Sequence, residues 1–118
     1  VYAAFSQDRG RSFGRNFKVQ DSFGDNMAQW HPAIAAGEDG RVVVAWDDER
    51  DGTPDVWLSE WNGSEFGDDQ ALSGAAGPGV QSDPVVHLDA RGALHAAWLE
   101  KTEAGGTRLR YASAVWKE

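Results

Sequence analysis

Hydrophobic and polar residues alternate over short stretches of this chain, and Gly, Asp, Asn and Pro separate those stretches. The runs RVVVAW and ALHAAW each end in tryptophan and follow a turn, at Asp39-Gly40 and Arg91-Gly92. No window has the spacing of an amphipathic helix, whereas short strands bounded by turn residues are typical of all-β proteins. The pattern therefore predicts an all-β fold with nine strands.

The chain contains an internal repeat. The segment HPAIAAGEDGRVVVAW (31–46) aligns without a gap on DPVVHLDARGALHAAW (83–98). A proline, a glycine and a tryptophan coincide at an offset of 52 residues, in the pairs Pro32 and Pro84, Gly40 and Gly92, and Trp46 and Trp98. Each unit thus reads as a strand after proline, a glycine turn, a strand ending in tryptophan, a polar loop and a third strand.

A weaker echo of the repeat precedes each of these segments. SQDRGRSFG (6–14) aligns on SEWNGSEFG (59–67) at an offset of 53 residues, with serine, glycine and phenylalanine in common. Alternatively, Tyr2 matches Trp57, and the second turn is then two residues shorter. In either alignment, both segments are a strand, a glycine turn and a second strand.

A unit of about 50 residues with four antiparallel strands has the size of a β-propeller blade. With the strands lettered A to D from the centre outwards, residues 1–31 supply strands C and D, 32–83 form a complete blade, and 84–118 supply strands A, B and C. About two and a quarter blades fall short of the four to eight of a closed ring and leave strand edges unpaired. We therefore expect homo-oligomerisation, with a trimer of two-blade units favoured, or completion by the rest of a longer propeller.

Ser6, Asp8, Gly10, Ser12 and Phe13 carry a family resemblance. They match every defined position of the Asp-box, and the chain resembles the sialidase-like Asp-box (BNR repeat) β-propeller family. The resemblance implies that this box lies on the turn between strands C and D, away from any active site. There Ser6 and Asp8 accept hydrogen bonds from backbone N–H groups, Gly10 supplies a special dihedral angle, and Phe13 buries its ring between sheets.

The catalytic residues of sialidases are not evident. That family uses three arginines, a tyrosine paired with glutamate and an acidic acid/base, but Tyr2 and Tyr111 are the only tyrosines and both lie in C-strand contexts. His31, His87 and His95 have no nucleophile-elbow pattern beside them. We therefore assign no catalytic residue and no cofactor, and expect a non-catalytic, self-assembling module with lectin-like carbohydrate binding. The alternative is a fragment or subunit of a sialidase-like glycoside hydrolase.

Six tryptophans provide the candidate glycan contacts. Trp46 and Trp98 are repeat-equivalent, and we expect both to pack between blades. An indole beside polar side chains can stack on the face of a sugar, or it can be buried for structural reasons. The candidate contacts are Gln29, Trp30 and His31, and separately Trp61 and Asn62.

The segment DDERDGTPD (47–55) is the densest acidic run. Asp47, Asp48 and Asp51 are candidate calcium ligands because hard cations favour oxygen-rich loops. The alternative is a solvated B–C loop in which Arg50 pairs with Asp48 or Asp55 in a modest exposed ion pair.

Composition narrows the classes of partner. The 118 residues include 11 basic and 19 acidic side chains, for a net charge of −8, and the basic residues are scattered. A nucleic-acid or anionic membrane surface is therefore not expected, nor is a membrane-spanning segment. The absence of cysteine excludes disulfides and thiolate chemistry. A secreted or periplasmic location is implied only by the family resemblance.

Overall fold

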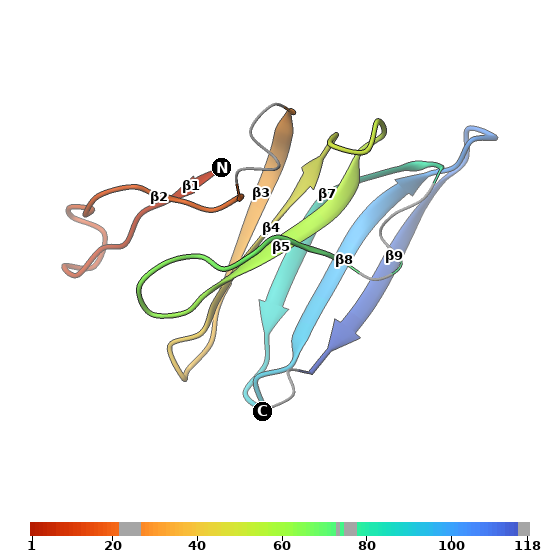
Figure 1. Cartoon of the computed structure of the whole chain (residues 1–118). Helices are drawn as coiled ribbons and strands as arrows, with labels where there is room; N and C mark the ends of the chain where they lie inside the picture. The colour runs from red at the N-terminus through yellow and green to blue at the C-terminus, as the bar shows by residue number, and fades with distance from the viewer. Residues whose placement is uncertain (22–26, 73, 75–77, 116–118) are drawn as a thin grey trace.

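The computed structural model describes residues 1–21, 27–72, 74 and 78–115, which form nine strands and no helix that could cross a membrane. The strands are β1 (Tyr2–Ala3), β2 (Phe17–Lys18), β3 (Gln29–Ala36), β4 (Val42–Asp48), β5 (Asp55–Trp61), β6 (Gln70–Ala71), β7 (Val80–Leu88), β8 (Leu94–Lys101) and β9 (Thr107–Ala114). They pair antiparallel in a first sheet (β1-β2), a middle sheet (β3-β4-β5-β6) and a last sheet (β7-β8-β9), shown in chain order in Figure 1. The predicted all-β class is confirmed, and none of the three sheets is closed.

The strand register decides between the two alignments of the weaker repeat. Tyr2 pairs with Lys18 in the first sheet, and Trp57 pairs with Ala71 in the middle sheet. Tyr2 therefore corresponds to Trp57, and the turn between β5 and β6 is two residues shorter than the turn between β1 and β2. The constant offset of 53 residues across both strands is wrong.

A tryptophan fills the space between each pair of neighbouring sheets, as predicted. Trp46 of β4 has no exposed surface and packs in a cluster with Val19, which follows β2. Trp98 of β8 is 1% exposed and packs against the middle sheet, in a cluster that includes Val43 and Ala45. Because the two tryptophans are repeat-equivalent, the middle sheet packs on the first sheet with the same face that the last sheet packs on the middle sheet.

The number of covered faces explains the difference between β4 and β8. Every residue of β4 is buried, because Val43 and Ala45 face the last sheet while Val44 and Trp46 face the first. β8 instead alternates between buried and more exposed residues, since only its Trp98 face is covered. The continuous run VVVAW and the mixed run LHAAW record this difference in the sequence.

Antiparallel pairing divides the connections between two ends of the molecule. β3 and β5 begin where β4 ends, and β7 begins where β8 ends. We call this the loop end, because the acidic segment between β4 and β5 lies there. The opposite, turn end carries the tight turns between β3 and β4 and between β7 and β8. The strands β3 and β7 both begin before the prolines at which the sequence placed their starts.

The turn at Ser6–Gly14 has the internal hydrogen bonds expected of it. The Ser6 hydroxyl oxygen accepts from the N–H of Gly10 at 2.7 Å, and the Asp8 carboxylate accepts from the N–H of Ser12 at 2.8 Å. Gly10 has a φ of 84°, which glycine adopts without steric cost. The predicted burial of Phe13 is wrong, because this residue is 64% exposed.

Two other aromatic rings occupy the space between this turn and the middle sheet. Phe5 and Phe17 flank the turn and pack on Trp61 of the middle sheet, with ring centroids 4.8 and 4.7 Å away. These two rings already fill the space against the middle sheet, so Phe13 is left at the surface.

Candidate functional site

A bulge interrupts the first strand of each repeat unit at the loop end. The register of β3 on β4 and of β7 on β8 shifts at corresponding points. His31 and Asp83 lie in these bulges, each directly before a proline, and have positive φ angles of 53° and 55°. His and Asp enter this left-handed region more readily than most residues, and bulges re-aim side chains. The sequence places two polar side chains at equivalent positions, and the bulges bring them together.

Asp47, at the end of β4, joins the two bulges. Its Oδ2 atom lies 2.7 Å from His31 Nδ1 and accepts the backbone N–H of Asp83 at 2.9 Å. The other ring nitrogen, His31 Nε2, lies 3.6 Å from Asp83 Oδ1. The Asp47 side chain is 3% exposed, whereas those of His31 and Asp83 are 55% and 48% exposed. We call these three residues the bulge cluster.

The bulge cluster is electrostatically asymmetric. The hydrogen bond with Asp47, and then the negative charge of Asp47, raise the pKa of His31 above its ordinary value of 6.5. Desolvation opposes this shift, and the charge of Asp83 adds to it. Both carboxylates therefore favour the protonated form of the imidazole, and Asp47 has the larger effect.

Trp30 extends the cluster with an exposed aromatic surface. It precedes His31 in β3, pairs with Asp47 in the strand register and is 57% exposed. An exposed indole beside carboxylate and imidazole groups offers a stacking face and hydrogen-bonding partners in one place. Two of the candidate glycan contacts, Trp30 and His31, are thus neighbours of a buried carboxylate. Gln29 is half-buried and pairs with Asp48 in the register.

The acidic loop is held by an arginine, Arg50, whose side chain is largely enclosed. Both oxygens of Asp48 accept hydrogen bonds from Arg50, and one also accepts from the Trp46 indole N–H at 2.9 Å. Arg50 reaches Asp69 at 2.6 Å and stacks over the ring of Trp57 at 4.1 Å. The predicted pairing of Arg50 with Asp48 is confirmed. Its predicted exposure is wrong, since the two side chains are 10% and 0% exposed.

The structure does not gather the three candidate calcium ligands. Asp47 belongs to the bulge cluster, whereas Asp48 faces the opposite side of β4 and is occupied by Arg50. Asp51 is exposed in the tight turn that follows. Successive residues of a strand point to opposite faces, so adjacent aspartates on β4 cannot share one ion.

Trp61 and Asn62 lie at the turn end, away from Trp30. The Trp61 ring is half-buried and packs on Phe66 as well as on the two rings beside the Ser6–Gly14 turn. The Asn62 side-chain oxygen accepts backbone N–H groups of Ser64 and Glu65, at 2.9 and 3.0 Å. The two groups of candidate glycan contacts therefore lie at opposite ends of the molecule, and the side chains of Trp61 and Asn62 make contacts within the fold.

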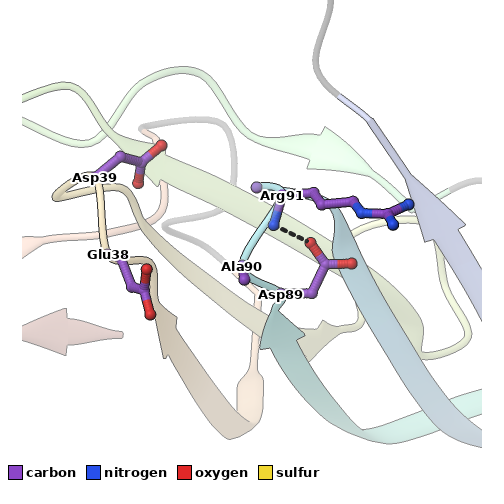
Figure 2. A pocket seen from close by; sticks show the side chains of 6 residues that line it. Glu38, Asp39, Asp89, Ala90 and Arg91 are labelled. Carbon is purple, nitrogen blue, oxygen red and sulfur yellow. Dashed lines mark hydrogen bonds between the residues drawn. The ribbon is translucent and has the colours of Figure 1, made fainter.

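A pocket of about 350 Å³ lies at the turn end, between the turns of the two repeat units (Figure 2). Its lining includes Glu38 and Asp39 from one turn and Asp89 and Arg91 from the other. Asp89 accepts the backbone N–H groups of Arg91 and Ala93. Its carboxylate is thus used within its own turn, which makes this pocket a weaker candidate site than the bulge cluster.

Asp89 also begins a chain of three hydrogen-bonded side chains. Its Oδ2 atom lies 2.8 Å from His95 Nε2, and His95 Nδ1 lies 2.5 Å from the Tyr111 hydroxyl oxygen. The hydrogen bond from His95 makes the largest contribution to lowering the pKa of Asp89 below its ordinary value, and the backbone N–H of Ala93 adds to it. His87 is exposed on β7, and His95 is half-buried on β8.

Asp83 is the cluster residue that the sequence did not single out. The signal was the parallel between QWHP (29–32) and QSDP (81–84), in which a polar residue precedes each proline at the offset of 52. The contact between the two bulges depends on how the middle and last sheets pack, which no local pattern reveals.

No family model, curated protein or solved structure matches the chain. A functional proposal for it therefore rests on its residues and their geometry.

Proposed function

We propose that this chain is a segment of a sialidase-like β-propeller that assembles with further blades and binds carbohydrate without hydrolysing it. The observation that carries the proposal is the repeated packing of a β-strand tryptophan, Trp46 and then Trp98, on the preceding sheet. A contact that recurs at the repeat spacing generates a ring or a stack when it continues. The Asp-box resemblance of Ser6–Gly14 favours the ring.

The strand content of the outer sheets is complementary. The first sheet has two strands and the last has three, against four in the middle sheet. In blade terms, divided at residues 32 and 84, the described residues include no strand A or B in the first sheet and no strand D in the last. The last sheet of one chain can therefore supply strands A and B to the first sheet of another, which supplies strand D in return, and one of the two C strands is then redundant.

Exposed apolar residues lie where the next blades would pack. Ile34 of β3 is 60% exposed, whereas its repeat equivalent Val86 packs against the core between the middle and last sheets. On the outer face of the last sheet, Val85, Leu109 and Tyr111 are 62%, 73% and 63% exposed. The equivalent face of the middle sheet is covered by Trp98, so the outer face is the position for one more blade.

The ring is completed by further copies of the chain, with three chains forming six blades, or by neighbouring blades of a longer chain. Light scattering on the 12.8 kDa chain tests the first arrangement. We expect the mass of a trimer. A stable, folded monomer would overturn assembly from copies of this chain.

Trp30 and the bulge cluster are the carbohydrate-binding surface in this proposal. The support is the exposed indole next to the hydrogen-bonded imidazole–carboxylate pair of His31 and Asp47 at the loop end. A glycan array followed by titration of the best ligand tests it. We expect Trp30→Ala to weaken binding at least tenfold, since stacking on an aromatic ring supplies much of the contact. Phe13→Ala, which removes a similarly exposed ring at the turn end, is the matched control and should leave affinity unchanged.

A glycoside hydrolase is the second candidate, favoured by the contact between the Tyr111 hydroxyl and His95. A base within hydrogen-bond reach of a hydroxyl is one requirement of an activated nucleophile. A fluorogenic sialoside separates the two candidates. The binding module gives no turnover, whereas turnover that Tyr111→Phe abolishes would establish the hydrolase.

A further inference from the structure

The imidazole of His31 is held between two carboxylates that differ in burial. The Asp47 side chain is 3% exposed and faces Nδ1 at 2.7 Å, whereas the Asp83 side chain is 48% exposed and faces Nε2 at 3.6 Å. Asp47 Oδ2 also accepts the backbone N–H of Asp83. The buried carboxylate is thus fixed in place by both bulges, and the exposed one borders solvent.

This arrangement selects one tautomer of the neutral ring. A carboxylate only accepts hydrogen bonds, so the contact of Asp47 Oδ2 with Nδ1 places the ring proton on Nδ1. The lone pair then lies on Nε2 and faces the Asp83 carboxylate. A proton on Nε2 or a metal ion between these two electron-rich atoms would offset their repulsion.

The separation of these two atoms suits a metal ion. A first-row divalent ion lies about 2.1 Å from an imidazole nitrogen or a carboxylate oxygen. With both atoms at about that distance, their 3.6 Å separation corresponds to an angle of about 120° at the metal, close to tetrahedral geometry. A metal-bound histidine almost always donates its other N–H to a carboxylate or carbonyl, which is the position of Asp47.

We propose that His31 Nε2 and Asp83 bind a divalent transition-metal ion of the Zn²⁺ type, with Asp47 orienting the imidazole. The two exposed ligand side chains leave the remaining coordination positions open to solvent. The site is therefore an open one, able to take water or a ligand oxygen as further ligands. Calcium is disfavoured because it prefers an all-oxygen shell. The proposal rests on the bulge cluster alone and does not require the glycan-binding function.

Isothermal titration of the full chain with ZnCl₂ at pH 7.5 tests the proposal. We expect one Zn²⁺ per chain, with affinity at least about tenfold lower in His31→Asn and in Asp83→Asn. Asparagine tolerates positive φ, so these variants keep the bulges, and circular dichroism checks their fold. His87→Asn, which removes an exposed histidine outside the cluster, is the matched control and should bind normally.

Nitrogen NMR of the histidine rings gives an atom-level readout. On addition of Zn²⁺, the Nε2 resonance of His31 should shift while Nδ1 stays protonated. Binding that weakens as pH falls is also expected, because protons compete for Nε2. The proposal is overturned if no Zn²⁺ binds at millimolar concentration, if His31→Asn and Asp83→Asn bind like the unchanged chain, if His87→Asn loses the site, or if Nδ1 is the coordinating atom.

Discussion

At the residue scale, short polar side chains act on their own backbone at several turns. Asp8, Asn62 and Asp89 each accept N–H groups of residues two to four positions further on. Such local contacts depend on a few adjacent residues, so the sequence revealed the Asp8 contacts directly. The bulge cluster is different, because Asp47 and Asp83 are 36 residues apart and meet only when two sheets pack.

Asp8 should titrate far below an ordinary aspartate. Its hydrogen bonds, of which the largest contribution comes from the Ser12 hydroxyl, lower its pKa from 3.8 to about 2. The stabilisation from the ionised carboxylate is therefore present above pH 3.8 and is lost as the pH falls through about 2. Carboxyl-carbon NMR gives the midpoint.

Ser12→Ala tests the cause of this shift. Removing the largest contribution should move the Asp8 midpoint upwards, towards 3.8. Ser64→Ala removes the serine of the corresponding turn between β5 and β6 and should leave the midpoint where it is. A midpoint that ignores Ser12→Ala would contradict the assigned cause.

At the element scale, the pattern of apolar residues along β4 and β8 depends on how many faces of the strand other sheets cover. β4 is enclosed on both sides and consists of apolar residues up to its two final aspartates, whereas β8 has one covered face. The tryptophan in each has a buried acceptor for its N–H group. For Trp98 this is Gln81, at 2.7 Å, in the neighbouring strand β7.

Trp98→Phe separates this hydrogen bond from ring burial. Phenylalanine keeps most of the apolar surface but leaves the buried Gln81 oxygen without its indole donor. The lost bond and the unfilled volume should lower the free energy of unfolding by about 1–3 kcal/mol, measured by chemical denaturation. Trp30→Phe, at an exposed position, should change it by less than about 0.5 kcal/mol. Equal effects of the two substitutions would contradict the packing described for Trp98.

At the scale of the whole molecule, the contacts run in one direction. The middle and last sheets each place their tryptophan face on the sheet before them. The face left exposed near the start of the chain is therefore different from the face left exposed near its end. A head-to-tail contact of this kind closes into a ring or continues as a filament. In the proposed assembly, the exposed Ile34 lies on the leading surface and the exposed Leu109 on the trailing one.

Mixing two variants tests this direction. Ile34→Lys blocks the leading surface and Leu109→Lys the trailing one, because a charge buried in an apolar contact is costly. Each variant alone should be monomeric by light scattering. An equimolar mixture should form dimers and no trimers, since one intact surface of each kind remains. Trimers in the mixture, or a dimer of either variant alone, would contradict the head-to-tail arrangement.

The sequence by itself determined the all-β class, the repeat, the glycine turns and the burial of Trp46 and Trp98. These follow from local spacing and from residue types whose preferences act over a few positions. Three features depend on how the sheets pack: Phe13 stays at the surface, the Arg50 side chain is largely enclosed between Asp48 and Trp57, and His31 and Asp83 meet at Asp47. The physical reason is common to all three. Contacts between residues far apart in the chain, and the choice of which side chain fills the space between two sheets, are set by which faces of the sheets pack together, and no run of adjacent residues encodes that choice.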